Sequence, residues 1–119
     1  MTHAIGTSLR HVGVRLALAL VAAIALDQPA VAAPPDTVRV DITKFAFAPK
    51  EITVQPGTRV VWTNRDETPH TVAGTDKSFA SKGLDTDDTF EQVFTREGDY
   101  AYVCTIHPFM TGVVHVRKQ

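Results

Sequence analysis

The sequence has a single cysteine, Cys104, among its 119 residues. One copy of the chain therefore has no second thiol for a disulfide bond, which excludes the cystine-stabilised class of small domains. A segment able to cross a bilayer as a helix is also missing, because the longest apolar run covers only residues 16–26. The formal net charge of −1 is too small to predict a nucleic-acid partner.

Residues 1–32 have the pattern of a secretory signal peptide. Arg10 and Arg15 precede the apolar run, and the small residues Ala30 and Ala32 follow it, so cleavage is expected after Ala32. An uncleaved N-terminal membrane anchor is the alternative, and the shortness of the apolar run disfavours it. We therefore expect a periplasmic protein that has no membrane association once the signal is removed.

The rest of the chain predicts one small all-β domain at residues 37–119, after a disordered lead-in at residues 33–36. Short runs of alternating or β-branched residues are separated by turns rich in Pro, Gly and Asp, a pattern typical of a β-sandwich or barrel. No stretch in this region has the pattern of a long amphipathic helix. The expected strands cover residues 37–42, 50–54, 59–64, 70–74, 89–95, 100–104 and 112–116.

The chemistry concentrates in the segment CTIHPFM, which offers the thiol of Cys104, the imidazole of His107 and the thioether of Met110. Thiolate and thioether favour Cu(I), while imidazole also suits Cu(II). Two histidines, one cysteine and a weak axial methionine are the ligand set of a blue-copper electron-transfer centre. His70 is the natural second histidine, because it follows a turn that could meet the Cys104–Met110 loop at one end of a sandwich.

Each of these residues also has an ordinary structural interpretation. Cys104 could be a small buried apolar residue, His107 a loop histidine and Met110 a filler of the core. The close spacing of the three, with a second histidine upstream, favours a metal site over these separate interpretations. His115 differs, because it alternates with two valines in its strand and is expected to face solvent.

The C-terminal segment FTREGDYAYVCTIHPFMTGVVHV resembles the cupredoxin family, and in particular the amicyanin and plastocyanin-like small periplasmic cupredoxins. The upstream segment VVWTNRDETPHTV resembles the part of the family that carries the first copper histidine, which places His70 in that role. The resemblance extends from about Phe45 to Val116. Two sequence departures are Thr71, where the family usually has asparagine, and Ile106, where amicyanins often have proline.

The resemblance implies an eight-stranded Greek-key β-sandwich that binds one copper ion in a type 1 site. It implies His70, Cys104 and His107 in a plane around the metal, with Met110 as a distant axial ligand. Thr71 and Thr105 are expected to contact the ligands. It also implies an apolar docking patch where one histidine reaches the surface, formed by Pro69, Ile106, Pro108 and Phe109.

Three classes of function compete at this stage. A monomeric one-electron carrier with transient protein donors and acceptors fits the ligand set best. A copper-binding module for delivery, sequestration or resistance is the alternative. An enzyme is disfavoured, because Val103 and Thr105 flank Cys104 where multicopper enzymes have a bridging histidine, and no substrate site is apparent.

Overall fold

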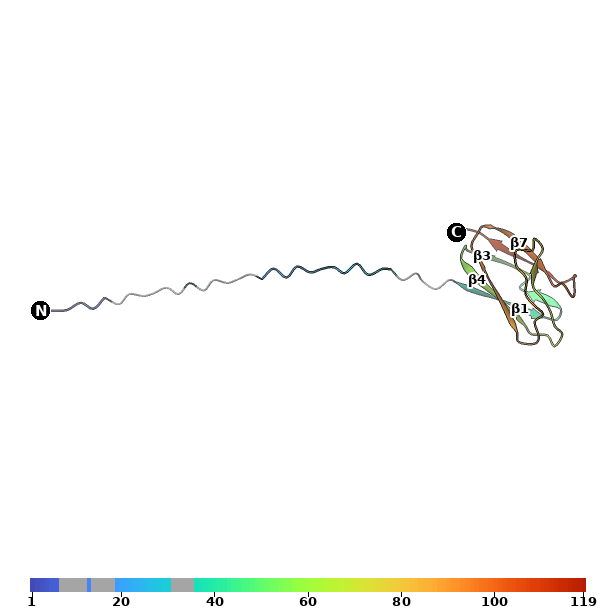
Figure 1. Ribbon diagram of the computed structural model, residues 1–119, viewed down its shortest axis with the longest axis horizontal. Coiled ribbons are helices and arrows are strands. Elements are labelled where there is room, and N and C mark those ends of the chain that lie inside the picture. The colour runs from blue at the N-terminus through green and yellow to red at the C-terminus, as the bar shows by residue number, and fades with distance from the viewer. Residues whose placement is uncertain (7–12, 14–18, 31–35) are drawn as a thin grey trace. The chain divides into compact units, whose positions relative to one another are not determined.

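The computed structural model divides the chain into two units, Met1–Val31 and Ala32–Gln119. It describes residues 1–6, 13, 19–30 and 36–119 (Figure 1). The described residues of the first unit form no helix or strand. No helix among the described residues is long and apolar enough to cross a bilayer. The signal peptide and the lead-in at residues 33–36 lie partly outside the described residues, so both stay predictions.

Eight strands form the second unit, and the described part of this unit contains no helix. The strands are β1 Thr37–Thr43, β2 Ala46–Ala48, β3 Glu51–Val54, β4 Thr58–Asn64, β5 Ala73–Gly74, β6 Thr89–Phe94, β7 Gly98–Val103 and β8 Thr111–Val116. They make two four-stranded sheets with the orders β2-β1-β4-β6 and β3-β8-β7-β5, which pack as a Greek-key sandwich (Figure 1). The predicted fold class and strand number are confirmed.

Both sheets mix parallel and antiparallel pairs. In the first sheet β1 runs parallel to β4, and β2 and β6 are antiparallel to their neighbours. In the second sheet β3 runs parallel to β8, while β7 is antiparallel to both β8 and β5. The parallel pairs join strands from separate hairpins, so the local alternation of the sequence does not reveal them.

The core lies between the two sheets and is built on Trp62. This side chain is fully buried, and the rings of Phe79, Phe90, Phe94 and Tyr102 lie 5.3–6.4 Å from it between centroids. Buried and more exposed residues alternate in β1 and β8, as the period of two requires, whereas β4 is buried along almost its whole length. His115 follows this alternation, because its side chain is partly exposed and the valines before and after it are buried, as predicted.

The region between β4 and β6 differs most from the prediction. The strand expected at residues 70–74 forms only at Ala73–Gly74, and His70 makes just an isolated bridge to Leu84. The loop that follows folds back and buries Phe79 and Leu84 in the core. Two apolar residues in a polar stretch gave no periodic signal, so the sequence indicated a loop but not its role in packing.

The pairing of β5 with β7 positions the functional site. Ala73 lies opposite Val103 and Gly74 opposite Tyr102. The chain entering β5 therefore runs beside the chain leaving β7. His70 precedes β5 by a short segment and Cys104 directly follows β7, so the two residues meet at one end of the sandwich.

Gly112 is expected to be essential for the packing of this end. It lies opposite Tyr102 across β7 and β8, and a methyl group at residue 112 would lie 2.3 Å from Cζ of that ring. Gly112→Ala should therefore lower the free energy of unfolding by about 1–3 kcal/mol in urea denaturation. Gly83→Ala is the matched control, because no heavy atom lies within 4 Å of the added methyl group. Equal effects of the two substitutions would contradict the packing argument.

Candidate metal centre

The loop between β7 and β8 is closed by its own backbone. The Cys104 N–H donates to the carbonyl oxygen of Met110 over 3.0 Å, and the Met110 N–H donates to the carbonyl oxygen of His107 over 2.9 Å. These bonds fold the seven-residue segment back on itself and carry the chain into β8. The short spacing in the sequence thus becomes a compact loop with Cys104 and His107 on one side.

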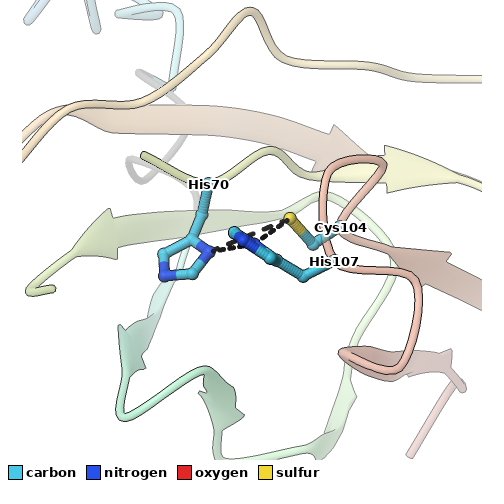
Figure 2. Close-up of side chains that lie close together, drawn as sticks. All are labelled: His70, Cys104 and His107. Atoms are coloured by element: carbon cyan, nitrogen blue, oxygen red, sulfur yellow. Dashed lines mark hydrogen bonds between the residues drawn. The ribbon is translucent and has the colours of Figure 1, made fainter. Parts of the chain in front are cut away.

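Three ligating atoms converge at this end of the sandwich. The Cys104 Sγ lies 3.9 Å from the His70 Nδ1 and 3.7 Å from the His107 Nδ1, and the two Nδ1 atoms are 3.2 Å apart (Figure 2). Figure 2 shows the three side chains pointing toward one another, Cys104 and His107 from the loop between β7 and β8 and His70 from the segment before β5. All three atoms lie within 4.8 Å of each other, so one metal ion could contact them together.

The site is buried on all sides but one. His70 and Cys104 have no solvent exposure, and Met110 is buried in the adjacent core. His107 is only partly buried, so its ring forms the edge of the site nearest solvent. The structure therefore brings together His70, Cys104 and His107 and places Met110 at the end of the same loop.

The sulfur of Cys104 sits in an environment that favours the thiolate. The Thr71 backbone N–H donates to Sγ over 3.4 Å, and the Thr71 hydroxyl lies 3.8 Å away. Burial alone would raise the pKa of the Cys104 thiol. Hydrogen bonds from the Thr71 N–H, from the His70 ring and from the backbone of residues 106–107 outweigh burial and lower this pKa to about 6.

Thr71 and Thr105, the two predicted neighbours of the ligands, contact each other. Their hydroxyl oxygens lie 2.8 Å apart, and the Thr105 N–H donates to the Thr71 Oγ1 over 2.8 Å. Thr71 reaches the sulfur directly, whereas Thr105 acts on it through Thr71. The pair also links the segment after His70 to the segment after Cys104, which holds the two ligating residues together.

Asp66 is a residue of the site that the sequence analysis missed. Its Oδ2 lies 2.9 Å from the Nε2 of His70, and its side chain is largely buried. The backbone N–H groups of Lys44 and Phe45 also donate to this carboxylate, over 2.7 and 2.9 Å. Burial raises the pKa of Asp66, but the donors from Phe45, His70 and Lys44 outweigh it and lower the pKa below its usual value.

The loop that carries Asp66 is anchored by the buried side chain of Asn64. Its amide donates to the carbonyl oxygens of Thr68 and Leu84 over 3.0 and 2.9 Å, and its Oδ1 accepts from the Asp66 N–H over 2.9 Å. One core residue thus satisfies three backbone groups of two loops. Because Asn64 is the last residue of β4, its hydrogen bonds attach the loop that leads to His70 to the sheet.

Exposed apolar side chains lie in the loop of His107, next to His70 and on the turn before β2. Ile106 is 52% and Phe109 72% exposed, and Pro69 and Pro108 are exposed as well. Phe45, which the sequence analysis did not include, is 42% exposed and lies edge-on to both histidine rings at 5.1–5.2 Å between centroids. In the sequence, only the presence of an apolar side chain in a polar turn could have indicated that Phe45 belongs to this surface. We call Phe45, Pro69, Ile106, Pro108 and Phe109 the apolar patch.

Comparisons with known proteins agree with this geometry. Residues 16–116 match the family of the cupredoxin-like domain. The chain is a cupredoxin. Amicyanin-alpha from Methylorubrum extorquens is 36% identical over 89 residues, which cover 71% of this chain and 75% of the relative. Amicyanin from Paracoccus versutus is 37% identical over 98 residues, covering 76% and 74% of the two chains.

A crystal structure of amicyanin from Paracoccus versutus is similar to this cupredoxin with a TM-score of 0.62 at 34% identity. The match covers 71% of this chain and 85% of the amicyanin chain. Copper is the cofactor of this cupredoxin. The donor set fits the metal, because one sulfur and two imidazole nitrogens converge in a buried site, and both donor types bind copper well.

The pKa of Cys104 leads to a prediction for the metal-free protein. Absorbance at 240 nm, which follows thiolate formation, should rise with a midpoint near pH 6, well below about 8.5 for an ordinary cysteine. Because the pKa is lowered on folding, the associated stability is present above the ordinary thiol pKa and is lost as the pH falls through about 6. Cys104→Ser should abolish the transition. A midpoint near 8.5 would contradict the prediction.

Proposed function

We propose that this cupredoxin is a one-electron carrier, in which His70, Cys104, His107 and Met110 would hold the copper ion. The main observation in support of this proposal is that the Cys104 Sγ and the Nδ1 atoms of the two histidines converge in a site that is buried except along His107. The similarity to amicyanins supports this function. When bound, copper would supply a Cu(II)/Cu(I) couple whose potential depends on the protein ligands and on the hydrogen bonds to sulfur.

The ligands are held in place by contacts that do not depend on the oxidation state. The loop bonds of Cys104 and Met110, the Thr71 N–H on the sulfur and the Asp66 carboxylate on His70 all come from the protein. A site fixed in this way needs little rearrangement when its charge changes by one. Small rearrangement favours fast electron transfer, and it suits a carrier that must gain and lose an electron repeatedly.

The apolar patch gives the electron a route in and out of the protein. His107 is the only one of the three converging residues that approaches solvent, and the rings of Phe45 and Phe109 in the patch lie beside it. A recess between Phe45 and Phe109 extends to Met110. A small apolar surface suits brief encounters with redox proteins, because such interfaces form and separate quickly. We propose transient donor and acceptor proteins that dock here on a monomeric carrier.

The predicted signal peptide supports a periplasmic location. The single unpaired cysteine is compatible with that oxidising compartment, because its thiol is buried and would be bound to the metal. The alternative of copper delivery or sequestration is less well supported. A delivery site must release its metal, whereas His70, Cys104 and Met110 are buried. We also propose that the protein is not an enzyme, because Val103 and Thr105 flank Cys104 and provide no ligand for a second metal centre.

The metal assignment predicts a strong visible absorption. The processed protein, without its signal peptide, should be intensely blue when loaded with Cu(II), because a cysteine thiolate bonded to Cu(II) gives a charge-transfer band. Visible spectroscopy with copper quantification measures it, at one copper per chain. Cys104→Ser should remove the band while the far-ultraviolet circular dichroism of the fold is retained. A band that survives this substitution would exclude Cys104 as the thiolate ligand.

The docking proposal predicts how fast two copies exchange electrons. Phe109→Lys adds a positive charge to the apolar patch, so two copies that meet there repel each other, and self-exchange measured by NMR should slow by about tenfold or more. Val93→Lys is the control, because Val93 is 41% exposed on β6, toward the opposite end of the sandwich. The same rate loss in both variants would refute docking at the patch, and slow exchange in the unmodified protein would favour copper storage.

A further inference from the structure

The Asp66 carboxylate joins two parts of the protein that are distant in the sequence. Its Oδ1 accepts from the Lys44 N–H, and its Oδ2 accepts from the Phe45 N–H and faces the His70 Nε2. Lys44 and Phe45 both have positive φ angles, 52° and 54°, which non-glycine residues rarely adopt. This turn is therefore held in an uncommon conformation in which both of its N–H groups point at one carboxylate.

The contact with Asp66 decides which nitrogen of His70 carries the proton when copper is bound. The Nδ1 faces the Cys104 Sγ and the His107 Nδ1, so its lone pair must be available for the metal. An ionised carboxylate can only accept hydrogen bonds, so the Nε2 beside it carries the N–H. Partners of this kind fix the tautomer of a metal-bound histidine and raise its basicity.

The charge on Asp66 also acts on the redox equilibrium. A nearby negative charge stabilises the more highly charged Cu(II) over Cu(I), and burial limits the screening of this effect by water. His70 has no solvent exposure and the Asp66 side chain is 14% exposed, so no bulk water separates the carboxylate from the ring. Removing the charge should therefore favour Cu(I).

We propose that Asp66 is a positioning residue that fixes the His70 tautomer and lowers the reduction potential of the copper centre. This inference rests on the proposed function, since it assumes that His70 binds copper through Nδ1. It goes further, because it assigns the setting of the potential to a side chain in the loop before His70. Asn64 and the Lys44–Phe45 turn hold the carboxylate in place for this role.

The test compares two substitutions that remove the same charge. Asp66→Asn keeps the shape of the side chain, and Asp99→Asn is the matched control, because Asp99 pairs with His115 at 2.7 Å at the far end of β7 from Cys104. We expect Asp66→Asn to retain the visible band and to weaken the binding of Cu(II) at least tenfold relative to the binding of Cu(I). This change raises the potential by about 59 mV or more for a one-electron couple. Asp99→Asn should change it much less. Voltammetry of the copper-loaded proteins measures both.

A second measurement uses the unmodified protein and does not depend on a variant that folds. In the diamagnetic Cu(I) state, nitrogen-15 NMR should show His70 bound through Nδ1, with a slowly exchanging proton on Nε2. A His70 Nε2 proton that is absent or exchanges rapidly with water, or a potential that rises no more in Asp66→Asn than in Asp99→Asn, would overturn the inference. If Asp66→Asn binds no copper, the NMR of the unmodified protein decides. A missing blue band in the unmodified protein would instead refute the proposed function.

Discussion

The burial of one sulfur atom is the constraint on which the rest of the copper end depends. Cys104 has no solvent exposure, yet its thiol must be able to ionise, and a buried charge needs donors or a cation beside it. The backbone N–H of Thr71 is such a donor, at 3.4 Å. It can reach the sulfur only if the segment around His70 lies against the end of β7, which the short pairing of β5 with β7 ensures. The hydrogen bond that favours the thiolate therefore also brings His70 to the site.

The second half of the site depends on the first through the loop after Cys104. The bonds from the Cys104 N–H to Met110 and from the Met110 N–H to His107 make this loop compact, so His107 turns back toward the sulfur. The same turn leaves Ile106 and Phe109 exposed on the outside. The loop thus contributes Cys104 and His107 to the metal site and Ile106 and Phe109 to the apolar patch. A substitution that changes the loop length would disturb both, whereas a change confined to an exposed side chain can alter docking and leave the donor geometry unchanged.

The sequence predicts this fold and site wherever the information is local. Alternation in residues 37–42 and 112–116 indicates strands, and the spacing of Cys104, His107 and Met110 indicates a soft metal site by donor chemistry alone. The parallel pairing of β1 with β4 is not local, and neither is the burial of Phe79, which fills a gap beside Trp62. Asp66 was missed for a related reason. An acidic residue four positions before a histidine is ordinary in a loop, and only the folded loop turns the two toward each other.

Phe45 connects the exposed surface to the interior of the centre. Its ring lies edge-on to both His70 and His107, and its backbone N–H is bound to the carboxylate that contacts His70. A redox partner docked as proposed would cover Phe45 and remove water from the edge of His107, which would strengthen the electrostatic effect of the Asp66 carboxylate. The proposed docking would therefore be coupled to the electrostatics of the site through the Lys44–Phe45 turn. Because Asn64 ties the Asp66 loop to β4, such coupling would require no movement of the ligands, only a change in the solvent around them.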